Sequence, residues 1–201
     1  MKTETFTESE IKHVQTVKQT LIDTLYDDYL KLKIAPFSTS HNNFFAGIQK
    51  TDLFLSGGAI ASLLQGEDPK DYDIYSRISL TGEFLEKLLS AHNDDIADVD
   101  EKYASLEMNG KVVTSRAISM KSRVQYILMH SGTPAQVKAT FDFVHCTPHF
   151  SFIDNKLYIS KKQYDACVNK KLIVNNPDAV TDKRIQKFKD RGYVQQLEQV
   201  V

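Results

Sequence analysis

The sequence has few of the features that mark specialised classes of protein. Its 201 residues include only two cysteines, Cys146 and Cys167, and no tryptophan, which excludes a disulfide-stapled scaffold. Its apolar runs, such as 59–64, fall far short of the ~18 residues that span a bilayer, and residues 1–10 are polar and acidic, unlike a signal peptide. With 25 basic and 26 acidic residues, the net charge of −1 gives no overall attraction to nucleic acid. We therefore expect a cytoplasmic protein with free thiols and no membrane contact.

The composition and the hydrophobic pattern are those of a globular α+β protein. Hydrophobic residues make up 41% of the chain and charged residues 25%. Thr7 and Glu10 have the form of a capping box, and helical periodicity follows to residue 32. The pattern further predicts strands over 52–56, 72–76, 111–114, 123–129, 139–144 and 150–153, and helices over 59–64, 80–92, 161–169 and 182–199.

These elements predict a mixed α/β arrangement in which one small sheet carries the chemistry. We expect about five strands in a mixed sheet, with helices on one face. Residues 1–160 are assigned to a core with its N-terminal helix, and residues 161–201 to a helical C-terminal extension.

The densest chemical signal is a double glycine followed by two aspartates. Gly57 and Gly58 end the first predicted strand, and Asp71 and Asp73 flank Tyr72 at the start of the second. Because side chains alternate along a strand, both carboxylates project from one face. Their mutual repulsion is relieved by a bound divalent cation, for which oxygen ligands of this kind suit Mg²⁺ or Mn²⁺. Taken alone, an Asp-x-Asp pair is also typical of a solvated strand end.

Two further features agree with a phosphate and metal site. Glycines at a strand end expose backbone N–H groups, and the helix that follows favours a phosphate at its start. Asp142 lies within the apolar run 139–144, where a buried acid needs a partner that a metal would supply. The alternative for Asp142 is an edge-strand position that faces water.

Residues 53–76 resemble the core motif of the DNA polymerase β-like nucleotidyltransferase superfamily. The double glycine is closest to the branch of tRNA CCA-adding enzymes and poly(A) polymerases. The resemblance implies two Mg²⁺ or Mn²⁺ ions held by Asp71 and Asp73, a third catalytic and metal-binding acid at Asp142, and transfer of a nucleoside monophosphate with release of pyrophosphate. The sequence departs from CCA-adding enzymes at Ala61 and Ser62, where those enzymes usually carry an arginine and an acid.

Basic residues near the C-terminus are candidates for nucleotide binding. Arg184, Lys187 and Arg191 are spaced to share one helix face, which could contact a triphosphate or an RNA backbone, although a solvated helix face has the same pattern. Ser56 beside the glycines is a further candidate. Arg116 is assigned to the nucleotide pocket from its position between predicted strands.

We therefore predict an enzyme that transfers a nucleoside monophosphate from a nucleoside triphosphate, with ATP included, to a hydroxyl acceptor. An RNA 3′ end, such as that of tRNA, is the favoured acceptor. Two alternatives remain: a non-catalytic module that binds nucleotide or RNA on the same fold, and an interaction protein of the toxin or antitoxin type.

Overall fold

The computed structural model describes residues 5–34, 53–78, 96–97, 106–108, 111–114 and 116–195. The helix expected over 80–92 lies outside these residues. Within them, no helix is both long and apolar enough to cross a membrane.

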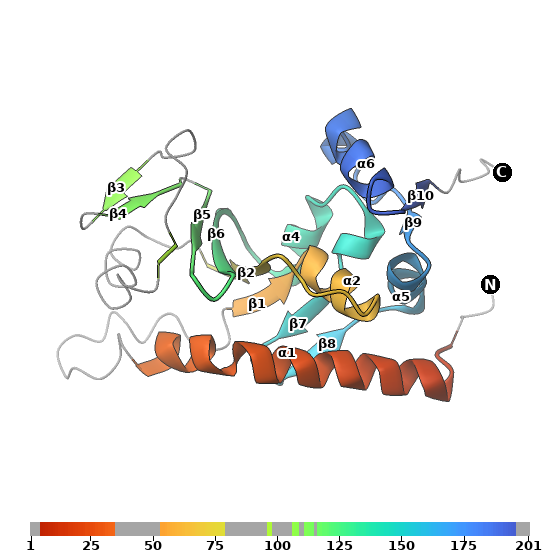
Figure 1. Ribbon diagram of the computed structural model, residues 1–201, viewed down its shortest axis with the longest axis horizontal. Helices are drawn as coiled ribbons and strands as arrows, with labels where there is room; N and C mark the ends of the chain where they lie inside the picture. The colour runs from red at the N-terminus through yellow and green to blue at the C-terminus, as the bar shows by residue number, and fades with distance from the viewer. Residues whose placement is uncertain are drawn as a thin grey trace.

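A six-stranded sheet lies at the centre, in the order β5-β6-β2-β1-β7-β8 (Figure 1). Its strands are β1 (Leu53–Ser56), β2 (Tyr72–Ser76), β5 (Ala117–Ser119), β6 (Val124–Ser131), β7 (His149–Ser151) and β8 (Lys156–Tyr158). β2 and β6 run parallel, and the other neighbours are antiparallel, so the mixed sheet is confirmed. A separate hairpin pairs β3 (Leu106–Met108) with β4 (Lys111–Val113).

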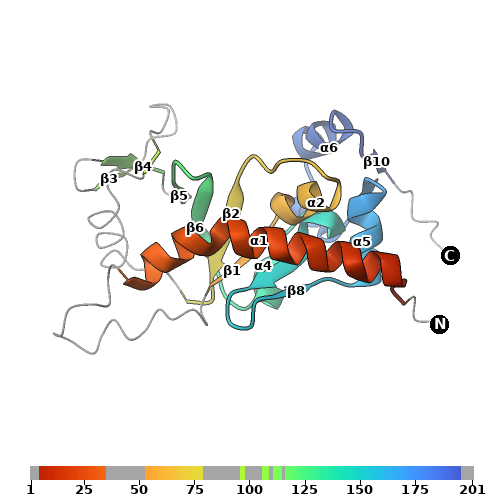
Figure 2. The ribbon, with the colours of Figure 1, turned by 60° about the horizontal axis from the view of Figure 1, so that its bottom comes forward.

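Three helices cover one face of this sheet: α1 (Glu8–Ile34), α2 (Gly58–Leu64) and α5 (Lys161–Val168). Figure 2 shows α1 crossing in front of the strands. The capping box is confirmed, because Thr7 N–H donates to Glu10 Oε2 over 2.8 Å and Glu10 N–H donates to Thr7 Oγ1 over 3.3 Å. Alternate strand residues, such as Leu55 and Ile74, pack beneath the helices and form the main core.

The opposite face of the sheet carries a smaller apolar cluster. Phe54 of β1 stacks on Tyr75 of β2 with ring centroids 5.7 Å apart. The short helix α4 (Pro134–Ala139) adds Val137 to this cluster. This face also carries Asp71 and Asp73, which precede Tyr75 at alternate positions.

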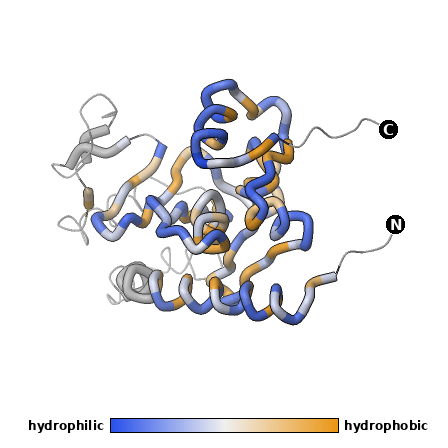
Figure 3. The backbone as a smooth tube through the Cα atoms, turned by 45° about the vertical axis from the view of Figure 1, so that its right-hand side comes forward, coloured by the Kyte–Doolittle hydropathy of each residue, from blue (hydrophilic) through white to orange (hydrophobic). Residues whose placement is uncertain are grey.

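The C-terminal part folds back toward α2. It contains β9 (Lys171–Leu172), the 3₁₀ turn η6 (Pro177–Ala179), α6 (Asp182–Lys189) and β10 (Val194–Gln195), which pairs with β9 in parallel. Figure 3 shows that hydrophilic residues dominate α6, at the top of the view. Its single buried side chain, Phe188, packs on the 3₁₀ turn η5 (Val144–Cys146) and its flanks.

The expectation of one helix over 182–199 is wrong. α6 ends at Lys189, and Gly192 adopts a φ of 83°, which turns the chain back. Tyr193 then packs beside Phe188, and Val194 N–H donates to the Lys170 carbonyl over 2.8 Å. A continued helix would forgo both contacts.

Candidate active site

A cavity of about 850 Å³ lies between the sheet and α6. One wall comes from the β1–α2 turn and from β2 with the loop before it, and the other comes from α6 and the two residues after it. The lining includes nearly every predicted site residue, namely Gly57, Gly58, Asp71, Asp73, Asp142, Arg184, Lys187 and Arg191. The topology therefore brings together residues from four distant parts of the chain.

Asp73 of β2 and Asp71, which directly precedes this strand, are half-buried carboxylates with no ion pair to any described residue. Burial, together with the negative charge of Asp71, raises the pKa of Asp73 to about 7. The positive charges of Lys187 and Arg184 across the cavity act in the opposite direction. A divalent cation bound between the two carboxylates would therefore stabilise their ionised forms.

Gly57 allows the β1–α2 turn to lie directly against this pair. Its φ is +101°, and a Cβ at this position would lie 3.0 Å from Asp73 Oδ2. Its N–H donates to the Cys146 carbonyl over 3.1 Å and is not free for a phosphate. Gly58, by contrast, begins α2 with open space around it, and its N–H belongs to the first helical turn, which lacks intrahelical acceptors. Of the two glycines expected to bind phosphate, Gly57 therefore has its N–H already bonded, and Gly58 is the one whose N–H needs an acceptor outside the helix.

Ser56 and Arg116 lie outside the described lining of the cavity. The Ser56 hydroxyl is fully buried and donates to the Pro148 carbonyl over 2.8 Å, which ties the end of β1 to the segment before β7. Arg116 is exposed just before β5.

Asp142 does not lie on a strand, and the strand predicted over 139–144 is wrong. Thr133 and Gln136 form a capping box that starts α4, and this helix extends to Ala139. Asp142 follows in an irregular connection and is buried, with 4% of its surface exposed.

Its carboxylate is already bound by Arg184. Arg184 Nε donates to Asp142 Oδ2 over 2.5 Å, and Arg184 Nη2 donates to Oδ1 over 3.2 Å. The Phe143 N–H adds a bond to Oδ1 over 3.0 Å. Across the described part of the chain, no three acidic, histidine or cysteine side chains are grouped closely enough to hold a metal. Asp142 therefore shares the cavity with Asp71 and Asp73 without joining them in one ligand cluster.

The α6 wall is basic. Besides Arg184, it presents Lys187 and, just beyond the helix, Arg191. Arg184 and Lys187 both lie over the Phe188 ring, 5.0 and 5.9 Å from its centroid. Phe188 thus anchors the helix while its neighbours face the carboxylates.

Two lysines line the cavity that were not among the site residues predicted from the sequence. Lys70 precedes Asp71, and Lys183 precedes Lys187 by one helical turn. The helical spacing was a usable signal for Lys183. Nothing local distinguishes Lys70 from other loop lysines.

Residues 25–170, more than half of the chain, match the family model Gad2, described as Gabija anti-defense 2 family protein. The chain belongs to the Gabija anti-defense 2 family. No curated protein matches this Gad2-family chain.

Solved structures similar to the Gad2-family chain include CCA-adding enzymes. The Thermotoga maritima CCA-adding enzyme complexed with tRNA is 14% identical, with a TM-score of 0.51 over 73% of this chain and 35% of the enzyme. A CCA-adding enzyme in complex with CTP is 18% identical, with a TM-score of 0.47 over 72% of this chain and 34% of that one. The first comparison shows a nucleotidyltransferase fold. The Gad2-family chain spans about a third of the length of these enzymes.

Proposed function

We propose that this Gad2-family chain is a metal-dependent nucleotidyltransferase of the DNA polymerase β-like superfamily. It transfers a nucleoside monophosphate from a nucleoside triphosphate to a hydroxyl, with an RNA 3′ end as the favoured acceptor, and releases pyrophosphate. The observation that carries the proposal is the pair Asp71 and Asp73, which has no protein counter-ion and faces the cations of α6 across one cavity. We place the activity in the cytoplasm and in the anti-defense role that the family's description names.

The residues present fit a divalent metal. Asp71 and Asp73 offer oxygen ligands, and burial together with the charge of Asp71 raises the pKa of Asp73, so a bound cation would favour its ionised form. Mg²⁺ and Mn²⁺ bind through one or two carboxylates together with substrate phosphates, so two aspartates are a sufficient protein contribution for two ions. When bound, these ions would neutralise phosphate charge and lower the pKa of the attacking hydroxyl.

The protein's own residues would position the triphosphate. The Gly58 N–H and the side chains of Lys187 and Arg191 lie around the cavity and supply donors for phosphate oxygens. Asp142 enters this proposal as the carboxylate that holds Arg184, in place of the third metal ligand that the resemblance implies. Arg184 is thereby fixed opposite Asp73.

Labelling experiments test the proposal. Full-length protein is incubated with Mg²⁺ or Mn²⁺, total RNA and each α-labelled nucleoside triphosphate, and pyrophosphate release is measured alongside. We expect RNA labelling that disappears in Asp71→Asn and Asp73→Asn and persists in Asp68→Asn, a carboxylate of the preceding loop that pairs with Arg123. Absence of transfer to RNA, protein or small molecules in the wild type would refute the activity.

One observation favours the non-catalytic alternative. Because Arg184 binds the Asp142 carboxylate, Asp71 and Asp73 are left, among the described residues, as the unpaired acids next to the glycine turn. A binding module would show nucleotide-dependent thermal stabilisation without pyrophosphate release. It would also retain that stabilisation for hours with no change in the nucleotide.

A further inference from the structure

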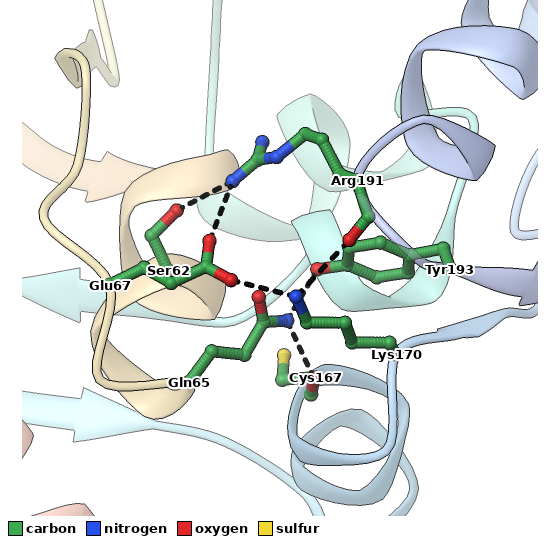
Figure 4. Close-up of polar contacts among 7 residues, drawn as sticks. All are labelled: Ser62, Gln65, Glu67, Cys167, Lys170, Arg191 and Tyr193. Carbon is green, nitrogen blue, oxygen red and sulfur yellow. Dashed lines mark hydrogen bonds and ion pairs between the residues drawn. The ribbon is translucent and has the colours of Figure 1, made fainter.

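A polar cluster joins three segments behind the α6 wall (Figure 4). Its members come from the end of α2 and the following turn, from the end of α5, and from the chain after α6. They are Ser62, Gln65, Glu67, Cys167, Lys170, Arg191 and Tyr193. None of them belongs to the metal-binding pair, yet Ser62 and Arg191 both line the cavity.

Glu67 is the central acid of this cluster. Its Oε1 accepts from Lys170 Nζ over 2.7 Å, and its Oε2 lies 3.4 Å from Arg191 Nη2. Lys170 Nζ also donates to the Arg191 carbonyl over 3.1 Å. Glu67 therefore binds the Arg191 side chain directly and the Arg191 backbone through Lys170.

Ser62 near the end of α2 makes a second contact with the Arg191 side chain. Ser62 Oγ accepts from Arg191 Nη2 over 3.0 Å, and Glu67 N–H donates to the Ser62 carbonyl over 2.9 Å. Figure 4 shows both side-chain contacts reaching one nitrogen of the guanidinium. The Nε and Nη1 atoms of Arg191 have no partner among the described residues. An anion in the cavity would find these donors already oriented.

Backbone geometry aims Lys170 at Glu67. Lys170 lies two residues after the end of α5 and has a φ of 48°, a left-handed conformation that is uncommon for a lysine. Gln65 holds the neighbouring backbone, because its Nε2 lies 2.7 Å from both the Cys167 carbonyl and the Tyr193 hydroxyl. The end of α5 and the chain after α6 are therefore fixed to the turn that carries Glu67.

These contacts do more for orientation than for stability. The Glu67 and Arg191 side chains are 39% and 33% exposed, and ion pairs this exposed contribute little to folding. Their geometric effect is specific, because Arg191 is a cation of the cavity wall and Glu67 is the carboxylate beside its guanidinium.

We propose that Glu67 is a positioning residue of the nucleotide site, which holds Arg191 in the orientation that binds the phosphates of a nucleoside triphosphate. Glu67 itself does not touch the nucleotide. The inference rests on the proposed function and adds to it a residue outside the cavity lining.

The test compares Glu67→Gln with Asp68→Asn. The glutamine keeps one oxygen for Lys170 but loses the second acceptor that faces Arg191, whereas Asp68 is the next residue and pairs with Arg123 away from the cavity. Binding of Mg²⁺–ATP is measured by calorimetry and transfer by steady-state kinetics, together with the melting temperature. We expect Glu67→Gln to weaken ATP binding about tenfold and raise KM to match, with kcat within about twofold and Asp68→Asn unchanged.

Three further variants separate positioning from a general structural role. Arg191→Met should weaken binding at least as much as Glu67→Gln, and the double variant should lose no more than Arg191→Met alone, because both changes remove one interaction. Glu67→Asp should recover part of the affinity. Fully additive losses, or a lower melting temperature with normal affinity, would overturn the positioning role.

The outcomes also distinguish this inference from the proposed function. If the wild type transfers nucleotide and Glu67→Gln binds ATP normally, the positioning role is wrong and the activity stands. If the wild type binds ATP without transfer and Glu67→Gln weakens binding, the activity is wrong and the positioning role stands. If the wild type binds no nucleoside triphosphate, both are wrong.

Discussion

Two of the segments that bring acids to the cavity fold by different principles. Residues 53–76 form strand, glycine turn, helix and strand, and Asp71 and Asp73 in this segment line the cavity without an ion pair to any described residue. Residues 134–146 form a helix, an irregular connection and a 3₁₀ turn, and their acid is buried against Arg184. The neighbours of an acid, more than its presence in a cavity, therefore decide whether its carboxylate is available to a metal or is bound by a cation of a packed helix.

The largest expected difference between the segments is in catalysis. Asp71→Asn and Asp73→Asn should each reduce nucleotidyl transfer by at least about 10³-fold. The reason is that the two carboxylates would bind the metal ions whose positive charge neutralises the phosphates. Asp142→Asn should leave measurable transfer with a raised KM, since Arg184 loses its anchor. Initial rates over a range of Mg²⁺ concentrations make the comparison, and chelation by EDTA should abolish the wild-type rate. Equal losses in all three variants, with unchanged folding, would place Asp142 among the metal ligands.

The largest expected effect of Asp142 is on folding stability rather than on catalysis. Asp142→Asn removes the charge that Arg184 binds in a buried setting and should lower the free energy of unfolding by about 2–3 kcal/mol. Asp68→Asn, which breaks the exposed pair with Arg123, provides the control and should cost no more than about 0.5 kcal/mol. Urea unfolding measures both variants. A loss for Asp142→Asn no larger than the control would show that the pair with Arg184 does not hold α6.

Acid sensitivity should arise in the second segment. His145 is fully buried among Phe143, Phe188 and Tyr193. Neither ring nitrogen has a hydrogen-bond partner among the residues that the structure describes, and burial lowers the pKa of His145 to about 3. Below the ordinary histidine pKa, His145 binds a proton in the unfolded chain but stays neutral in the folded one. The free energy of unfolding therefore falls as the pH drops from about 6.5 toward 3.

Replacement of this histidine measures the effect. Between pH 6.5 and about 5 the wild type should lose roughly 2 kcal/mol through this group, and His145→Leu should remove that part of the loss. Melting temperatures across this range make the comparison. Parallel pH profiles for the two proteins would contradict the assignment.

The same contrast explains how much of the structure was predictable from sequence. The elements of 53–76 follow local rules. A short apolar run defines β1, Asp73 alternates with apolar neighbours in β2, and Gly57 marks the turn between β1 and α2. The cavity wall of aspartates was predictable for the same reason. The run 139–144 also alternates, but Phe143 is buried by contact with Phe188 of α6, more than forty positions away, and not by strand pairing in the central sheet.

Two details of the fold beyond residues 53–76 had local signals and one had none. Thr133 with Gln136 is a capping box before a proline, which indicated α4. Gly192 indicated the end of α6. The pairing of Asp142 with Arg184 joins residues whose proximity depends on the whole C-terminal fold, and no local pattern predicts it.

A contrast within the first segment separates its two adjacent glycines. Gly57→Ala places a methyl group 3.0 Å from Asp73 Oδ2 at a φ of +101°, so it should cost about 1–3 kcal/mol of stability and displace that carboxylate. Gly58→Ala meets no atom within 4 Å and lies in a helix, where alanine is favoured, so it should be neutral or stabilising by up to about 1 kcal/mol. Thermal unfolding of the two single variants, each with and without Mg²⁺, measures the difference. Gly57→Ala should also lose metal-dependent stabilisation that Gly58→Ala keeps, and equal behaviour would show that the turn does not press against Asp73.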